Sequence, residues 1–207
     1  MIRAILFDVD GVLTDTIECN ARYFSHVLQK FGGKPLSADE YRQFYHLTAK
    51  SVFMHFFPEK SENQINEIIK YGLSVLPKFY IYARLNPDVK ETLEILKRQF
   101  RLGIVTSKIE TGILEYFRIN KFFDTAVTFL DVKNHKPHPE PVQLALKKLG
   151  IKPEEALYVG DALSDFQAGN QAGVKVIIYR NPEVKGDYNI NNLKEIPGIA
   201  EKLNRQS

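Results

Sequence analysis

The stretch that decides the fold is MIRAILFDVDGVLT, residues 1–14. Its apolar run, residues 2–7, predicts a buried strand, and Asp8 and Asp10 follow directly in a turn that contains Gly11. Two carboxylates two residues apart at the end of a strand suit catalysis, because one can act as a nucleophile while the other transfers protons. Turns also favour Asp and Gly for conformational reasons, so this stretch alone is equally compatible with solvated turn residues.

Four further apolar runs predict strands, and amphipathic helical patterns lie between them. The predicted strands cover residues 102–105, 125–129, 156–159 and 174–179, and the predicted helices cover residues 88–98, 110–118, 140–149 and 164–172. Strands that alternate with helices of this length indicate βαβ units. We therefore expect an α/β fold built on a doubly wound parallel sheet.

Residues 15–84 interrupt this alternation, because they show helical periodicity and no strand pattern. We expect helices at residues 19–31, from Ser37 onward, at 49–57 and at 61–82, the last one kinked or broken at Pro77. Ser37 and Glu40 have the spacing of a capping box at a helix start. The sequence thus predicts a core formed by residues 1–14 and 85–207, with an all-helical cap inserted at residues 15–84.

Composition narrows the functional classes. The 207 residues carry a net charge of +3 without any block of Lys or Arg, which argues against a nucleic-acid or membrane-surface partner. Cys19 is the single cysteine, so an intrachain disulfide and a thiolate metal cluster are excluded. The sequence has no apolar run of the length that a membrane span needs. We expect a cytoplasmic protein, and the sequence is silent on its oligomeric state.

Three more polar clusters lie at or beyond the ends of predicted strands. They are Thr106-Ser107, then Lys136 in a proline-rich loop, and then Gly160-Asp161-Ala-Leu-Ser-Asp165. Each has an ordinary interpretation by itself, as a helix N-cap or a solvated lysine. Because the carboxyl ends of parallel strands meet at one edge of the sheet, we expect all of them to converge on the acids of the first loop. Clustered carboxylates form an all-oxygen site suited to Mg²⁺.

In this order and spacing, the four motifs resemble those of the haloacid-dehalogenase-like superfamily of phosphohydrolases, and the match extends across the whole chain. The helical insertion corresponds to that superfamily's cap, and Leu85-Asn86-Pro87 is similar to its return linker. The resemblance is to the branch that holds phosphoglycolate phosphatases, small pyrophosphatases and β-phosphoglucomutases. It implies a phosphoric monoester hydrolase that depends on Mg²⁺ and forms an aspartyl-phosphate.

The resemblance also implies a role for each motif residue. Asp8 is expected to be the nucleophile and a metal ligand, and Asp10 the general acid/base with its backbone carbonyl on the metal. The expected phosphate-binding residues are Gly11, Thr106, Ser107 and Lys136. Asp161 and Asp165 are expected to complete the metal site, and which of them binds Mg²⁺ directly stays open. Four converging carboxylates require a compensating cation, which Mg²⁺ and Lys136 supply.

Substrate choice is expected to lie in the cap, where His46 and Lys50 are candidates to meet a small phosphorylated metabolite. The substrate that we expect is pyrophosphate, phosphoglycolate or another small phosphomonoester. Two alternatives stay open: a phosphosugar mutase and a non-catalytic binding protein on the same fold. Hydrolysis is favoured over the mutase because this chain has Asn20, and His46-Leu47, where the mutases that it resembles carry a His and a Lys-Gly pair.

Overall fold

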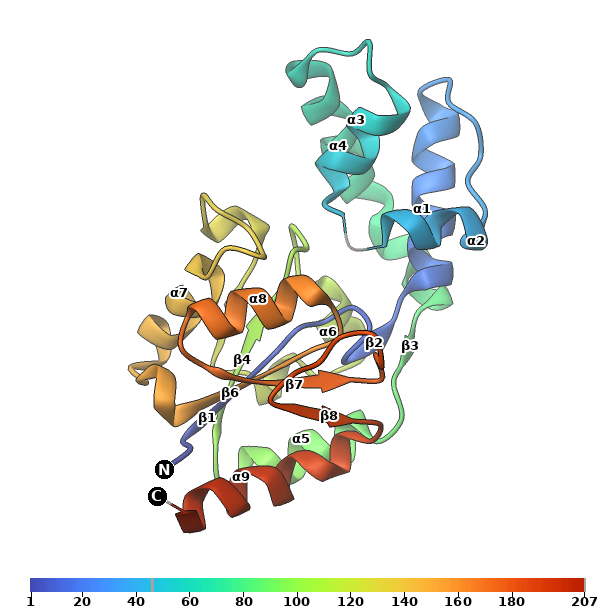
Figure 1. The fold of residues 1–207 in the computed structure, drawn as a ribbon. Helices are drawn as coiled ribbons and strands as arrows, with labels where there is room; N and C mark the ends of the chain where they lie inside the picture. Colours follow the sequence, from blue (N-terminus) through green and yellow to red (C-terminus); the bar gives the residue numbers. More distant parts are fainter. Residues whose placement is uncertain (46, 207) are drawn as a thin grey trace. The chain divides into compact units, whose positions relative to one another are not determined.

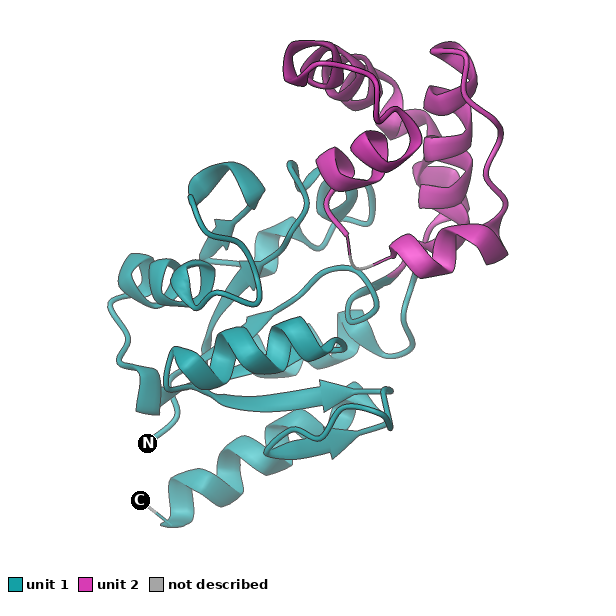
Figure 2. Cartoon of the chain, turned by 45° about the horizontal axis from the view of Figure 1, so that its top comes forward, with its two compact units in different colours: residues 1–14, 85–207 teal, residues 15–84 magenta. Residues whose placement is uncertain are grey.

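The computed structural model describes residues 1–45 and 47–206 (Figure 1). The chain divides into two compact units, Met1–Thr14 with Leu85–Ser207 and the helical segment Asp15–Arg84 (Figure 2). The first unit is called the α/β unit below, and the second is called the helical unit. Within the described residues, no helix combines the length and apolar character that crossing a membrane requires.

The α/β unit is built on a parallel sheet of six strands in the order β5-β4-β1-β6-β7-β8 (Figure 1). The strands are β1 Ala4–Phe7, β4 Arg101–Val105, β5 Thr125–Val127, β6 Ala156–Gly160, β7 Lys175–Tyr179 and β8 Tyr188–Ile190. The central strands are buried on both faces, which explains why they read as continuous apolar runs rather than as alternating ones. The predicted doubly wound parallel sheet is confirmed.

Helices cover both faces of this sheet. They are α5 Val89–Lys97, α6 Gly112–Tyr116, α7 Glu140–Leu149, α8 Leu163–Gln171 and α9 Ile196–Gln206, with short 3-10 turns at Asn120–Phe122, Phe129–Asp131, Pro153–Glu155 and Leu193–Glu195. Helices α7 and α8 pack on one face, where Leu6 and Tyr158 of the sheet meet Val142 and Ala168 of the helices. Helices α5 and α9 lie on the other face (Figure 1).

The register of the sheet fixes where each strand ends. Phe7 at the end of β1 lies opposite Ile104 of β4 and Val159 of β6. The residues that follow these three positions therefore leave the sheet side by side. This edge carries Asp8, Thr106 and Asp161.

The helical unit contains α1 Ile17–Lys30, α2 Ala38–Tyr41, α3 Ala49–Phe56 and α4 Glu62–Val75, with 3-10 turns at Arg42–Phe44 and Leu76–Tyr82. Its interior combines aliphatic side chains with a group of aromatic rings: Phe24 stacks on Tyr41 with ring centroids 5.3 Å apart and lies 5.2 Å from Phe53. The capping box predicted for Ser37 and Glu40 is present. The long helix predicted at residues 61–82 is divided just before Pro77, which lacks the N–H that an α-helix needs.

The segments that connect the two units pair with each other as the two-residue strands β2 Thr14–Asp15 and β3 Arg84–Leu85. Asn86 reinforces the start of the return segment. Its side-chain amide donates to the carbonyls of Gly11 and Val12 at 2.8 and 2.9 Å, and its backbone N–H donates to Leu13 at 3.0 Å. Three consecutive carbonyls of the first loop are thus held by one residue.

Candidate active site

Asp8 stands at the centre of the carboxyl edge of the sheet. It directly follows β1, its backbone N–H donates to the carbonyl of Val159 at 2.9 Å, and only 7% of the residue is exposed. Burying a carboxylate is costly unless other groups compensate its charge. The surroundings of Asp8 therefore decide what this position can do.

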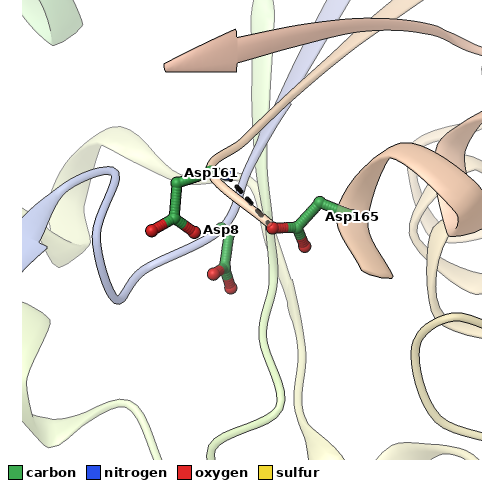
Figure 3. A group of neighbouring side chains, drawn as sticks. All are labelled: Asp8, Asp161 and Asp165. Carbon is green, nitrogen blue, oxygen red and sulfur yellow. Dashed lines mark hydrogen bonds between the residues drawn. The ribbon is translucent and has the colours of Figure 1, made fainter. Parts of the chain in front are cut away.

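Three carboxylates meet at this edge. Asp8, Asp161 and Asp165 each bring one oxygen within 4.8 Å of the others, and Figure 3 shows Asp8 and Asp161 close together with Asp165 arriving from α8. Gly11 makes the approach possible, because a Cβ on Gly11 would lie 1.8 Å from Oδ2 of Asp161. Gly11 also adopts a φ of 80°, in the left-handed region that favours glycine.

Lys136 reaches this cluster from the loop before α7. Its ammonium lies 3.0 Å from Asp8 and 2.6 Å from Asp165, with 6% of its side chain exposed. It also donates to the hydroxyl of Tyr158 at 3.3 Å. A lysine this buried is unusual without paired acids, so its position is set by the two carboxylates.

Asp165 is the carboxylate whose oxygens are already engaged by protein donors. Besides Lys136, it accepts from the Tyr158 hydroxyl at 2.7 Å and from the backbone N–H groups of Asp161 and Ala162 at 3.2 and 3.1 Å (Figure 3 shows the Asp161 bond). It therefore holds Lys136 and the loop after β6 in place. Asp161 itself is positioned by Asn181, whose side-chain amide donates to the Asp161 carbonyl at 2.7 Å.

The pKa values of these groups shift in two directions: upward for Asp8, Asp161 and Lys136, and downward for Asp165. Burial raises the pKa of Asp8 to about 7 against the opposing charge of Lys136, and burial together with the charge of Asp8 raises the pKa of Asp161 to about 8. Burial also acts to raise the pKa of Asp165, but the charge and hydrogen bond of Lys136 outweigh it, and this pKa is lowered. For Lys136, burial is outweighed by the charges of Asp165 and Asp8, so its pKa is raised.

The donor set fits a hard divalent cation. Asp8 and Asp161 are close together, and burial, together with the charges of the neighbouring carboxylates that Lys136 only partly offsets, raises the pKa of both. All donors are carboxylate oxygens, the ligands that Mg²⁺ and Ca²⁺ prefer. Asp8 and Asp161 are the side chains that could hold such an ion directly, since the oxygens of Asp165 already accept four hydrogen bonds from the protein.

Asp10 forms an ion pair with a second lysine, Lys108. Its carboxylate lies 3.1 Å from the ammonium of Lys108, and the two side chains are 20% and 15% exposed. Lys108 follows the predicted hydroxyl pair directly. Thr106 is buried, and its hydroxyl accepts the backbone N–H of Lys108 at 3.2 Å, while Ser107 is half-buried. The acid pair of the first loop is therefore matched by two lysines, one for each acid.

The structure does not test whether the predicted cap residues, His46 and Lys50, bind substrate. Lys50 forms an ion pair with Glu62 at the surface of the helical unit, and His46 lies outside the described residues. A cavity of about 350 Å³ in the helical unit is lined in part by Asp15, Arg42 and Arg84. The assignment of His46 and Lys50 to substrate binding stays a prediction.

Sequence reasoning missed four residues at this site: Lys108, Tyr158, Asn86 and Asn181. Lys108 carried a usable signal, since it is a cation immediately after the Thr106-Ser107 pair. Tyr158 is an interior residue of β6 and the two asparagines lie in connecting segments, so nothing in the sequence pattern distinguishes them.

The protein has a doubly wound α/β unit with buried acids at the carboxyl edge of its sheet, and two lysines face these acids. A helical insertion follows the first strand. Together these features define one class of structure. The family model described as haloacid dehalogenase-like hydrolase matches residues 5–179 of this chain. The chain belongs to this family.

Individual relatives cover nearly the whole chain. Pyrophosphatase PpaX of Bacillus cereus (strain B4264) is 32% identical over 217 aligned residues, which cover 99% of each chain. The crystal structure of a predicted phosphoglycolate phosphatase from Haemophilus somnus 129pt superposes with a TM-score of 0.81 at 26% identity, covering 96% of this chain and 97% of that one. The β-phosphoglucomutase of Clostridium difficile shares the fold, with a TM-score of 0.86 at 21% identity and coverage of 100% and 99%. The branch expected from the motifs is confirmed.

Proposed function

We propose that the protein is a Mg²⁺-dependent phosphohydrolase that removes a phosphoryl group from a small metabolite through an aspartyl-phosphate on Asp8. The observation that carries this proposal is the arrangement around Lys136, which holds the buried Asp8 at 3.0 Å while Asp161 adds a second carboxylate. Family membership and the likeness to a pyrophosphatase support the same reaction class.

In the first half-reaction, a carboxylate oxygen of Asp8 attacks phosphorus, and the bond from phosphorus to the leaving oxygen breaks. Asp10 donates its proton to that oxygen. In the second half-reaction, Asp10 takes a proton from water, the water oxygen attacks phosphorus, and the bond to Asp8 breaks. Mg²⁺, when bound, neutralises charge on the phosphoryl oxygens.

The phosphoryl oxygens have clear partners in this arrangement. Thr106 directly follows β4 and offers its hydroxyl, the backbone of Ser107 comes next, and Lys136 adds a positive charge on the side of the proposed nucleophile. Such preorganised donors stabilise the charge that develops in phosphoryl transfer. Gly11 serves the site by leaving room for Asp161.

The substrate that we propose is pyrophosphate or a short phosphorylated acid such as phosphoglycolate. A phosphosugar mutase is the second candidate, since a mutase shares the fold at full coverage. Asn20 argues against it: the side chain is buried and its amide donates to the hydroxyl of Thr16 at 3.3 Å, so this position has no ionisable group to transfer a proton.

The test is phosphate release from pyrophosphate, phosphoglycolate, p-nitrophenyl phosphate and a panel of sugar phosphates, with Mg²⁺ and with EDTA. Metal-dependent release that disappears in Asp8→Asn supports the proposal. Isomerisation of glucose 1-phosphate at a rate above phosphate release would instead support the mutase. A folded protein inactive in both assays would contradict both enzymatic functions and leave a binding role.

A further inference from the structure

Lys108 is a second lysine at the site and is largely shielded from solvent, and the hydrolytic mechanism above gives it no task. Its backbone is fixed from two sides, because its N–H donates to the hydroxyl of Thr106 at 3.2 Å and its carbonyl accepts from the N–H of Phe129 at 2.8 Å. Its side chain is only 15% exposed and ends 3.1 Å from the Asp10 carboxylate. Lysine side chains normally keep their ammonium in water, so this placement needs a partner of opposite charge.

The two lysines serve opposite ends of the reaction. Lys136 is paired with Asp8 and Asp165, on the side of the nucleophile. Lys108 is paired with Asp10, the group that protonates the leaving oxygen. In an in-line displacement the leaving group departs opposite the nucleophile, next to the acid. An ammonium within ion-pair distance of Asp10 therefore lies within reach of groups attached to the leaving oxygen.

We propose that Lys108 binds an anionic group carried by the leaving group and thereby selects substrates that have one. This inference rests on the proposed function and narrows its substrate class. In pyrophosphate the leaving group is itself a phosphate, and in phosphoglycolate it carries a carboxylate; both offer oxygens to an ammonium. Pyrophosphate is the stronger ligand of the two, because its leaving phosphate carries more charge close to the acid.

The test compares Lys108→Met with Lys108→Arg on matched pairs of substrates. Phosphoglycolate is paired with 2-hydroxyethyl phosphate, which has the same length and a neutral leaving group, and pyrophosphate is paired with methyl phosphate. In Lys108→Met, the ratio of kcat/KM for the charged to the neutral member of each pair falls by about 10- to 100-fold, the worth of a charge-assisted hydrogen bond. Lys108→Arg retains most of the preference.

Lys148→Met is the matched control, since Lys148 pairs with Asp131 on the surface of the same unit. Its substrate ratios stay at the wild-type value. If the rates of Lys108→Met on both members of each pair fall together and the ratio stays within about threefold of wild type, Lys108 acts only through Asp10 and the inference is overturned. A larger effect on phosphoglycolate than on pyrophosphate would identify the carboxylate as the preferred group and retain the inference.

A binding measurement separates this inference from the proposed function. Methylenediphosphonate, whose P–C–P linkage resists hydrolysis, is titrated calorimetrically into the wild type and Lys108→Met, with methylphosphonate as the reference that has one phosphonate group. Weaker binding of the diphosphonate to the variant, with little change for methylphosphonate, supports the inference even for a protein that turns nothing over. A wild-type protein that binds the two ligands equally well, or binds neither, would overturn it.

Discussion

The two units of this protein differ in the side chains that they bury: the α/β unit buries charged groups, and the helical unit buries apolar ones. In the α/β unit, Asp8 and Asp165 are 7% and 0% exposed, and the side chain of Lys136 is 6% exposed between them. In the helical unit the interior is apolar, formed by aromatic and aliphatic side chains, and ion pairs such as Lys50 with Glu62 lie at the surface. Buried charges cost free energy that aromatic packing does not. The comparison shows that the α/β unit gives up stability at the edge of its sheet, where the motifs lie, whereas the helical unit does not.

The largest expected effect is on the activity of the α/β unit. Asp8→Asn removes the proposed nucleophile while keeping the shape of the side chain, so kcat for phosphate release is expected to fall by about 10⁴-fold or more. Asp39→Asn, a change of the same kind at a fully exposed position of the helical unit, leaves kcat at the wild-type level. Both variants are assayed with circular dichroism as the check on folding. Residual activity of Asp8→Asn near the wild-type rate would show that another group attacks phosphorus.

Two lysine variants, one in each unit, test whether buried ion pairs contribute more to the free energy of unfolding than exposed ones. Lys136→Met leaves Asp8 and Asp165 buried without their partner, and the free energy of unfolding is expected to fall by about 3 to 5 kcal/mol. Lys50→Met breaks a solvent-exposed pair and costs about 1 kcal/mol or less. Urea unfolding followed by circular dichroism, in EDTA, measures both. Equal losses for the two variants would remove the distinction between the units.

The metal-free protein is expected to lose stability as the pH rises from about 4 to 8. In the folded state the pKa of Asp8 is about 7 and that of Asp161 about 8, whereas the unfolded value is 3.8, so the folded state holds more protons in this window. Each group contributes a slope of at most about 1.4 kcal/mol per pH unit. The pKa of Asp165 is lowered, so its effect on stability has the opposite sign. Its contribution to stability is lost at lower pH, as the pH falls and the carboxylate becomes protonated.

Calorimetric Tm values between pH 5 and 8 check this expectation. Tm falls with pH in EDTA, Mg²⁺ restores it at pH 8, and Asp161→Asn shows both a weaker fall and a weaker response to Mg²⁺. A Tm that rises from pH 5 to 8 in EDTA would contradict the unbalanced negative charge at this edge.

The smallest expected effect belongs to the helical unit. Ser37→Ala removes the side chain that accepts the N–H of Glu40 at the start of α2, and the expected cost is about 1 kcal/mol. Ser37→Asp preserves an acceptor and is the control. Hydrogen exchange of the helical unit measures the loss. No change in Ser37→Ala would mean that tertiary packing, rather than its cap, holds this short helix.

Much of the fold could be predicted because buried parallel strands carry a strong signal. Strands β1, β4, β6 and β7 are apolar runs that end where polar motifs begin. The sequence pattern does not predict β2 and β3, which span two residues each, or β8, which has the sequence Tyr-Asn-Ile and lies at the edge of the sheet, where only part of it is buried. The helix predicted at residues 110–118 is shorter, because it ends at Tyr116 and Arg118 adopts a left-handed φ of 58°.

The site could be predicted where residues follow strands, as for Asp8 and Asp161. It could not be predicted where a contact depends on how side chains turn after folding, as in the hydrogen bond from Tyr158 to Asp165. In the helical unit, residues such as Lys50 look like those of any amphipathic surface, and among its described residues no buried charged side chain distinguishes one of them. The proposed role of the helical unit in substrate binding is therefore the part of the function that the sequence pattern supports least.

The bonds from Asn86 to three consecutive carbonyls, and the pairing of β2 with β3, hold the two ends of the insertion side by side. For the sheet, the whole of residues 15–84 is equivalent to one long hairpin loop. The entropic cost of closing a loop grows only with the logarithm of its length, so the insertion adds little to the cost of folding the sheet. For the folding of the sheet, the helical unit is thus an exchangeable module, and its replacement would leave the buried acids and lysines at the edge of the sheet intact.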